Sequence, residues 1–371
     1  MVIGIDASRA FRKERTGTEE YSYELIKRLV RLGSSHQFIL YTDRKIEIGN
    51  CRRRAKAAMV TARKLGNIKI KYMPFPRLWT QIRLSWEMLI NPPDVLFIPA
   101  HAMPIVRPKK TVVTIHGLEY EYFPEAYSSF ERWYLKWSTR FTSRHAWKII
   151  TPSQNTKRDL IKFYGTDSDK IRAIRHGFAK SKMMVNSKQI TEKSRYPYLL
   201  FIGRLEKRKN ILRLIDAFCM LKQKYKIPHR LILVGKPGYG HKNSKFKIQN
   251  SKFKSDIIEL GYVSQEEKFG LLKNADVFVY PSLYEGFGMP VLEAFSLGTP
   301  VVCSSASSLP EVAGNAAILV DPLDVYSIAS GVWKILSDKK LNTECVQKGS
   351  IQVQKFSWDK CARETLSILE L

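Results

Sequence analysis

The sequence predicts an α/β protein with doubly wound parallel sheets, organised as two domains. Short apolar runs alternate with helical patterns along the chain, which is typical of parallel sheets covered by helices. The chain has 371 residues, of which 44% are hydrophobic, and this exceeds what a single core usually holds. A polar, lysine-rich stretch near 181–195 separates the halves. We therefore expect an N-terminal domain over 1–180, a linker over 181–195 and a second domain over 196–355.

The N-terminal domain begins with an apolar strand at 2–5, followed by a loop and an amphipathic helix that carries Tyr23 and Leu29. Another buried strand is expected at 111–115, and it delivers His116 at its carboxyl end. Ligands bind at this edge of an open parallel sheet. His116 is therefore a candidate site residue, although a lone histidine is more often a structural one, and both interpretations stay open.

In the second domain, an apolar strand at 198–202 ends at Gly203 and leads into a helix at 210–221. Arg204 and Lys209 then lie at a strand end beside a helix N-terminus. Arginine offers a planar fork and lysine a compact charge, so the pair could neutralise a diphosphate and stabilise it as a leaving group. The alternative is a surface basic cluster, which is common in a chain with 62 Lys and Arg.

The most informative motif is EGFGMPVLE, which joins an apolar strand at 276–281 to a helical pattern. The helix N-terminus presents unpaired N–H groups to this loop, and Gly286 and Gly288 allow a ligand to approach the backbone closely. The carboxylates of Glu285 and Glu293 can accept hydrogen bonds from several hydroxyls. Phosphate together with a polyol indicates a sugar nucleotide. The alternative is a turn with two solvated glutamates.

Taken together, these residues resemble the family 4 glycosyltransferases, the retaining enzymes of the "glycosyl transferases group 1" type with the GT-B architecture. The resemblance covers most of the chain and is strongest over 198–321. It is carried by these motifs: Gly203-Arg204 with Lys209-Asn210, Leu231 to Gly235, the Glu285/Glu293 pair, Ser308 to Val312, and Val320-Asp321-Pro322. The resemblance implies two facing Rossmann-like domains with a cleft between them, and a C-terminal helix, here 356–371, that crosses back to the N-terminal domain.

The resemblance also implies roles for individual residues. Glu285 and His116 would contact the donor sugar, Glu293 the ribose hydroxyls, and Arg204 and Lys209 the diphosphate. Other expected donor-binding residues are Gly17, Gly203, Gly235, Gly286, Phe287, Gly288 and Met289, the last three through their backbone. The family often has a second glycine where this chain has Thr18.

The function implied by the resemblance is retaining transfer of a hexose-type sugar from a nucleotide-diphosphate donor to an acceptor hydroxyl. The acceptor would be a glycan or a lipid-linked glycan in the synthesis of cell-surface polysaccharide or glycolipid. The stretch from His116 to Glu125 is similar to bacterial mannosyl- and rhamnosyltransferases, which makes GDP-mannose the first donor to test. One alternative is a GT-B sugar-nucleotide epimerase. Another is a basic nucleic-acid-binding protein, but an aromatic-rich RNA-binding pattern is lacking.

The pattern Asp167-Ser168-Asp169 has the spacing of a metal-binding DxD motif. Its context is a turn before a short strand, in which Asp and Ser are ordinary turn residues. We therefore expect no metal site there and no cofactor, because Arg204 and Lys209 would neutralise the diphosphate.

The net charge is +28, and most of it lies in the first half. Residues 1–190 hold 36 Lys and Arg against 16 Asp and Glu, a net of +20, which leaves +8 for the rest. From Arg44 to Arg77 there are 11 basic residues and one acid, followed by Trp79 and Trp86 as candidate interfacial anchors. A solvated face, an anionic membrane or lipid-linked acceptor, and nucleic acid all remain open as explanations.

Location in the cell follows from what the sequence lacks. No apolar run reaches the length of a membrane helix, and the first residues are expected to form a strand rather than a signal peptide. Five cysteines, an odd number without a CxxC pair, suit reduced thiols. We expect a cytoplasmic protein, peripheral at the inner face of the membrane if the basic region contacts lipid.

Overall fold

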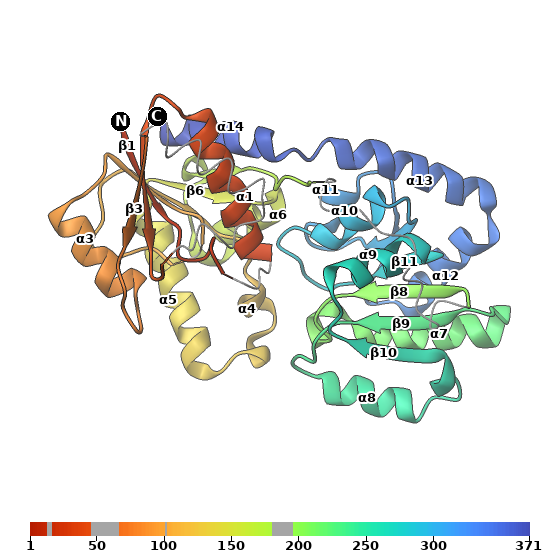
Figure 1. Ribbon diagram of the computed structural model, residues 1–371. Coiled ribbons are helices and arrows are strands. Elements are labelled where there is room, and N and C mark those ends of the chain that lie inside the picture. Colours follow the sequence, from red (N-terminus) through yellow and green to blue (C-terminus); the bar gives the residue numbers. More distant parts are fainter. Residues whose placement is uncertain (13–16, 46–66, 101, 180–195) are drawn as a thin grey trace. The chain divides into compact units, whose positions relative to one another are not determined.

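The computed structural model describes residues 1–12, 17–45, 67–100, 102–179 and 196–371. Their contacts divide the chain into two compact units, shown in Figure 1. The first unit comprises Met1–Gly177 and Ser357–Leu371, and the second comprises Phe178–Phe356. The predicted linker at 181–195 lies outside the described residues.

The first unit is built on a parallel sheet that has seven strands among the described residues, in the order β3-β2-β1-β4-β5-β6-β7. The strands are β1 (Val2–Asp6), β2 (Gln37–Thr42), β3 (Ile68–Tyr72), β4 (Val95–Ile98), β5 (Thr111–Thr114), β6 (Lys148–Thr151) and β7 (Ile171–Ala173). Most of their side chains are apolar on both faces because helices cover both sides of such a sheet, whereas the edge strand β3 alternates apolar residues with Lys69 and Lys71. The chain starts in the middle and winds outward in both directions, so the strand order reverses between β1 and β4.

Helices of the first unit include a segment from near the end of the chain. They are α1 (Gly17–Leu32), a π-helical turn (Thr80–Leu84) that continues into α3 (Ser85–Ile90), α4 (Glu119–Tyr122), α5 (Ser129–His145), α6 (Gln154–Tyr164) and α14 (Trp358–Leu369). Helix α14 packs on α1, and Asp359 accepts ion pairs from Arg28 at 3.1 Å and Arg31 at 2.7 Å. Gly177 meets the start of α14 so closely that a Cβ atom there would lie 2.2 Å from the Trp358 nitrogen.

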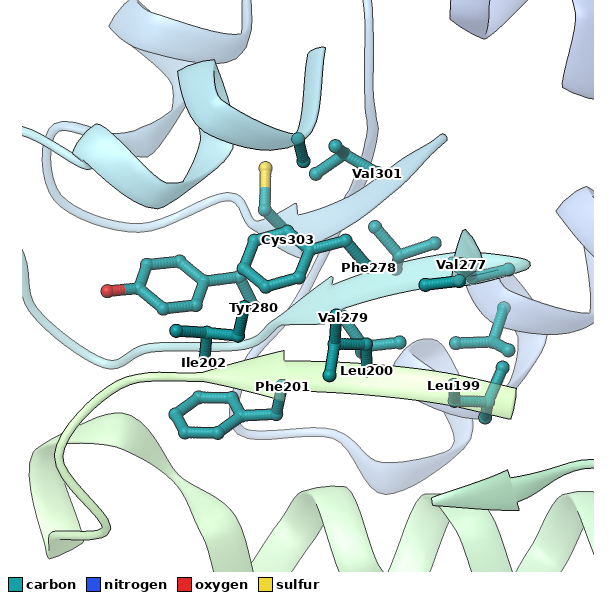
Figure 2. Packing of buried hydrophobic residues seen from close by; sticks show 14 of the residues in the cluster. Leu199, Leu200, Phe201, Ile202, Val277, Phe278, Val279, Tyr280, Val301 and Cys303 are labelled. Atoms are coloured by element: carbon teal, nitrogen blue, oxygen red, sulfur yellow. The ribbon is translucent and has the colours of Figure 1, made fainter. Parts of the chain in front are cut away.

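The second unit repeats the same plan with six described strands, all parallel, in the order β10-β9-β8-β11-β12-β13. They are β8 (Tyr198–Ile202), β9 (Arg230–Val234), β10 (Ile257–Gly261), β11 (Val277–Tyr280), β12 (Val301–Ser304) and β13 (Ile318–Val320). Figure 2 shows how the side chains of β8, β11 and β12 pack into one buried cluster. The strand order reverses between β8 and β11, which makes their carboxyl ends the place where this fold binds ligands.

Helices of the second unit are α7 (Ile211–Tyr225), α8 (His241–Gln249), α9 (Gln265–Asn274), α10 (Met289–Ser296), α11 (Leu309–Ala313), α12 (Val325–Ser337) and α13 (Lys339–Gln354). From the sequence, the repeat NSKFK at 243–247 and 250–254 is predicted to be an inserted mobile loop. That prediction is wrong for the first copy, which forms most of α8. Helix α8 packs on α7, where Lys247 pairs with Asp216 at 2.5 Å, and these contacts stabilise a helix that the sequence pattern does not indicate.

Two α/β units with parallel sheets confirm the predicted fold class. Within the described ranges, no helix combines the length and apolar character needed to cross a bilayer.

Candidate active site

The candidate site lies in the second unit at the adjacent carboxyl ends of β8 and β11. Asn210 holds the loops together there from the left-handed conformation (φ 64°) that asparagine tolerates well. Its side-chain amide donates to the Pro281 carbonyl at 3.0 Å and to the Pro322 carbonyl at 2.6 Å. The Leu283 N–H donates to the Arg208 carbonyl at 2.9 Å. The loops after three strands are therefore fixed to one another.

A buried cluster of charges occupies this position. The Lys209 ammonium donates to Glu285 Oε1 at 2.5 Å and to the Tyr280 hydroxyl at 2.6 Å. Arg208 Nη1 lies 3.2 Å from Glu285 Oε2 and donates to the Tyr284 carbonyl at 2.8 Å. Glu206 accepts from Arg208 at 2.7 Å. Lys209 and Glu285 are only 7% and 8% exposed, so the two charges depend on each other and on these hydrogen bonds.

The protonation state of Glu285 follows from two opposed effects. Burial alone would raise the pKa of the Glu285 carboxyl, but the charges of Lys209 and Arg208 outweigh it and hold this pKa at about 2. Burial lowers the pKa of Lys209, and the nearby Glu285 carboxylate opposes that effect. Glu285 is therefore a carboxylate at neutral pH, able to accept hydrogen bonds.

Tyr280 connects the cluster to the core. Its ring stacks on Phe201 and Phe278 at centroid distances of 5.8 and 5.5 Å. Figure 2 shows its hydroxyl pointing away from the packed rings, and this hydroxyl accepts from Lys209. Burial raises the pKa of Tyr280 well above its usual range, so the phenol keeps its proton. The core thereby fixes the position of the Lys209 ammonium.

Two serines hold the backbone of the Glu285 loop. Ser307 accepts from the Glu285 N–H at 3.0 Å and donates to the Glu285 carbonyl at 2.5 Å. Ser308, which is fully buried, lies 2.9 Å from the same carbonyl and 2.7 Å from the Phe287 carbonyl. These contacts give the Ser308-containing motif of the sequence a structural task, which is to position the loop that carries Glu285.

The same loop continues into the N-terminus of α10. Gly288 precedes this helix at φ +118°, and a Cβ atom there would lie 2.7 Å from a Leu309 methyl carbon. Only glycine suits both the conformation and the space. The Phe287 side chain is 7% exposed and packs edge-on against Phe356, so only its backbone can face a ligand. The helix N-terminus and half-buried Gly286 and Met289 complete this edge of the site.

Glu293 lies further along α10, with a different partner. Its Oε1 accepts from the Lys268 ammonium of α9 at 2.6 Å, and both side chains are about 15% exposed. Glu285 thus lies at the start of the loop and Glu293 in the helix that follows it. The two carboxylates pair with different cations.

Arg204 and Gly203 follow β8. The Arg204 side chain is 66% exposed, and its ion pair with Glu206 is long, at 3.9 Å. Gly235, after the neighbouring strand β9, has φ +150°, and a Cβ atom there would lie 1.9 Å from the Gly203 carbonyl oxygen. Gly203 and Gly235 therefore let two loops touch. Arg208 is the cation that contacts Glu285 beside Lys209, and sequence reasoning missed it.

His116 and Gly17 belong to the first unit. His116 Nε2 donates to the Pro99 carbonyl at 2.8 Å, which fixes the ring at the ends of β5 and β4. Its ring lies 4.8 Å from that of Tyr21 and 5.4 Å from that of His176. Burial and the neighbouring His116 lower the pKa of His176 well below its usual value. Gly17 is exposed at the start of α1, with open space where a Cβ would be.

The DxD pattern is part of a turn. Asp167 accepts from the Asp169 N–H at 2.9 Å and caps the short 3-10 helix Ser168–Lys170. This contact agrees with its prediction as a turn residue.

Comparisons with known proteins cover nearly the whole chain. The model of Glycosyltransferase Family 4 matches residues 15–181, and that of Glycosyl transferases group 1 matches residues 184–352. O-antigen chain mannosyltransferase B of Escherichia coli is 28% identical, over 99% of each chain. The chain belongs to the family 4 glycosyltransferases. This family 4 glycosyltransferase is also 28% identical to O-antigen chain mannosyltransferase RfbU of Salmonella typhimurium, over 63% of each chain.

Solved structures give the same fold for this family 4 glycosyltransferase. Sucrose-phosphate synthase of Thermosynechococcus elongatus superposes with a TM-score of 0.72 at 19% identity, over 98% of this chain and 97% of that one. HepE of Anabaena, solved in complex with UDP and glucose, has a TM-score of 0.71 at 17% identity, over 100% and 99%. The protein is thus a glycosyltransferase of the GT-B fold. The site roles inferred from resemblance remain predictions.

Proposed function

We propose that the enzyme transfers a mannosyl-type hexose from a nucleotide-diphosphate donor to a hydroxyl of a glycan acceptor, with retention at the anomeric carbon. The relatives support the sugar and the acceptor, since two of them are O-antigen chain mannosyltransferases. The product would be part of a cell-surface polysaccharide or glycolipid.

The observation that carries this proposal is the buried cluster of Lys209, Glu285 and Arg208 beside the N-terminus of α10. A helix N-terminus and cations attract a diphosphate, and a carboxylate fixed in its ionised form accepts sugar hydroxyls. Arg204 adds an exposed charge next to Gly203, at the strand end where the diphosphate would lie. Glu293 would accept hydrogen bonds from the ribose hydroxyls, and these would replace part of its contact with the Lys268 ammonium.

Catalysis in this proposal is positioning and charge stabilisation. Lys209 and Arg204 draw negative charge onto the departing diphosphate, while Glu285 and His116 orient the sugar. The resemblance implies that a donor phosphate oxygen takes the acceptor proton, so no side chain has to act as the base. In this proposal the acceptor oxygen bonds to the anomeric carbon as the bond from that carbon to the diphosphate breaks, without a side-chain nucleophile. We further propose that these cations and the helix end replace a metal ion in neutralising the leaving group.

A donor screen by thermal shift tests the proposal on the whole chain. GDP-mannose, UDP-glucose, ADP-glucose and dTDP-rhamnose are added in turn at the same concentration, and the donor with the lowest Kd raises the unfolding temperature most. We expect GDP-mannose to give the largest shift. The Lys209→Ala variant should lose that shift, whereas Lys222→Ala, which breaks a partly buried ion pair with Asp256, should keep it.

Transfer itself is then measured with the donor that binds and an O-antigen-type oligosaccharide. The anomeric configuration of the product, read by NMR, tests retention. An inverted product, or a full shift in Lys209→Ala, would contradict the proposal. Release of free sugar without an acceptor would point to the epimerase alternative.

A further inference from the structure

A stripe of exposed apolar side chains runs along one side of the π-helical turn and α3 in the first unit. We call it the apolar stripe, and its residues are Leu78, Ile82, Trp86, Leu89 and Ile90, which are 54%, 49%, 59%, 62% and 56% exposed. Ile82 precedes Trp86 by four residues, and Leu89 and Ile90 follow it by three and four, which places these four on one side of the helical segment, and Leu78 lies just before its first turn. Surface helices normally turn charged and polar residues outward.

The opposite side of the same segment is already seated in the domain. Trp79 is 8% exposed and its indole donates to the Met73 carbonyl at 2.6 Å, while Leu84 and Met88 are buried. Of the two tryptophans considered as anchors, Trp79 is therefore a core residue, which is the more common position for a tryptophan. Trp86 is exposed, as such an anchor requires. The side chains of the apolar stripe are thus not needed to pack this segment against the domain.

Neighbouring segments extend this apolar surface. The N–H groups of Ile105 and Val106 donate to the Ser85 hydroxyl at 3.0 and 3.3 Å, which holds both residues, 49% and 39% exposed, beside α3. Gln81 donates to the Tyr134 hydroxyl at 2.6 Å, which links the turn to α5. Figure 1 shows α3 and α5 as separate helices of this unit. Helix α5 displays a further exposed aromatic pair, Phe130 and Trp133.

Most charged side chains next to the apolar stripe in the chain are basic, and the exposed carboxylate of Asp94, four residues after Ile90, accepts from the Val2 N–H at 2.7 Å. Lys69 and Arg77 are exposed just before it. The carboxylate within the segment, Glu87, is 3% exposed and pairs with Lys71 and Arg83, so it presents little negative charge to solvent. Much of the basic stretch from Arg44 to Arg77 falls on residues 46–66, which lie outside the described part of the chain.

We propose that the apolar stripe and its basic flanks dock on the surface of an anionic phospholipid bilayer. Tryptophan, leucine and isoleucine would enter the boundary between headgroups and acyl chains, while lysine and arginine contact lipid phosphates. This surface belongs to the first unit, and none of its residues is among those proposed to bind the donor.

Two other occupants fit the surface less well. A second copy would bring together two N-terminal halves that each carry a net charge of about +20, which repel each other. A nucleic acid would match the charge, but four of the five side chains in the stripe are aliphatic and offer no ring for base stacking.

Vesicle co-sedimentation of the whole chain tests the proposal. Vesicles of phosphatidylcholine alone are compared with vesicles that contain about one-third phosphatidylglycerol, at low and high salt. We expect binding to the anionic vesicles that weakens as salt rises. The double variant Trp86→Ser, Leu89→Ser should bind at least about tenfold more weakly, because two large side chains no longer enter the interface.

A matched control removes exposed apolar surface from the second unit. Phe246→Ser together with Tyr262→Ser, whose side chains are 69% and 64% exposed, should bind vesicles like the wild type. Because all four side chains are exposed, both double variants should fold, and circular dichroism checks this. The double variant Lys69→Gln, Arg77→Gln should weaken binding to the vesicles that contain phosphatidylglycerol and leave binding to pure phosphatidylcholine vesicles unchanged.

Two results would overturn the proposal. The first is equal vesicle binding by the wild type and the Trp86→Ser, Leu89→Ser variant. The second is a dimer in sedimentation velocity that this variant dissociates, which would assign the apolar stripe to a second copy of the chain.

Discussion

Glu285 shows, at the scale of the residue, how a buried charge is maintained. An ionised carboxylate taken out of water is costly unless cations and hydrogen bonds replace the lost solvent. Lys209, Arg208 and the serine-held loop supply those partners here. Such strongly perturbed groups at a strand end are frequent in functional sites. Removal of the Glu285 carboxylate should therefore slow the reaction more than removal of an ion pair elsewhere in the protein.

The first prediction concerns this pair. Glu285→Gln and Lys209→Ala should each lower kcat by about 10²-fold or more, the usual cost of losing one charge-stabilising group. Lys222→Ala is the control, since Lys222 pairs with Asp256 just before the amino end of β10, away from the carboxyl ends of the strands. Steady-state kinetics decide the matter, with unfolding temperatures recorded for each variant. Near-normal kcat in both site variants would remove these residues from the active site.

Glu293→Ala should act mainly on donor binding. Contacts to the ribose are made equally in the ground state and the transition state, so their loss raises KM for the donor and leaves kcat nearly unchanged. Lys268, its partner at 2.6 Å, would lose its ion pair at the same time. Kinetics at varied donor concentration separate the two parameters. A fall in kcat as large as that of Glu285→Gln would contradict a role in ribose binding.

The pKa of Glu285 predicts a pH dependence of stability. The folded-state pKa of about 2 is below the usual 4.5, so the carboxylate stabilises the fold above pH about 4.5. That contribution, on the order of 3 kcal/mol, is lost as pH falls toward 2. The difference in unfolding free energy between wild type and Glu285→Gln should therefore shrink as pH falls from about 5 to about 2. Urea titrations measure it, and a constant difference would contradict the assigned pKa.

Sequence reasoning found part of this cluster and missed part of it. Lys209 and Glu285 were predicted to share a site because each follows an apolar strand that the fold class brings to one edge. Arg208 and Tyr280 were missed, since one is the middle of a KRK run and the other ends a strand. Which lysine or arginine of the run turns inward is set by Asn210, whose left-handed backbone ends the turn. Asn directly after the basic run is the signal that could have indicated this.

At the scale of the element, the loops after β8 and β9 depend on two glycines. Gly235→Ala would place a carbon 1.9 Å from the Gly203 carbonyl and must force the two loops apart. Gly165→Ala in the first unit is the matched control, because Gly165 has a positive φ of 61° but nothing within 4 Å. The control should cost about 1 kcal/mol from backbone strain.

Gly235→Ala should cost at least about 2 kcal/mol more, because overpacking adds to the strain, and it should abolish the donor-induced thermal shift. Urea unfolding and the donor screen measure the two effects. Equal losses in the two variants would mean that the loops do not need this contact.

Element types were predictable where the pattern was strongly periodic. The strands at 198–202 and 276–281 and the helix at 210–221 correspond to β8, β11 and α7 within a few residues. Helix α8 was not predictable, because its sequence His241–Gln249 has no regular apolar face. Its contacts with Asp216 and neighbouring residues of α7 come from a distant part of the chain, and tertiary packing outweighs local preference there.

At the scale of the whole molecule, the proposed independence from metal ions is open to a direct test. Transfer activity should survive EDTA, because side chains and a helix end neutralise the diphosphate. The assay is run with and without added Mn²⁺ or Mg²⁺. Loss of activity in EDTA that either ion restores would contradict the proposal and return attention to Asp167 and Asp169.

The path of the chain through its two units also bears on how the protein is made. Helix α14, which covers α1, is synthesised after the entire second unit. The Phe178 N–H donates to the Phe356 carbonyl at 3.1 Å, so the segments that enter and leave the second unit run side by side. On the ribosome, domains usually fold in the order in which they emerge. Here the second sheet can be complete while α1 still awaits α14, so the domain that is begun first is finished last.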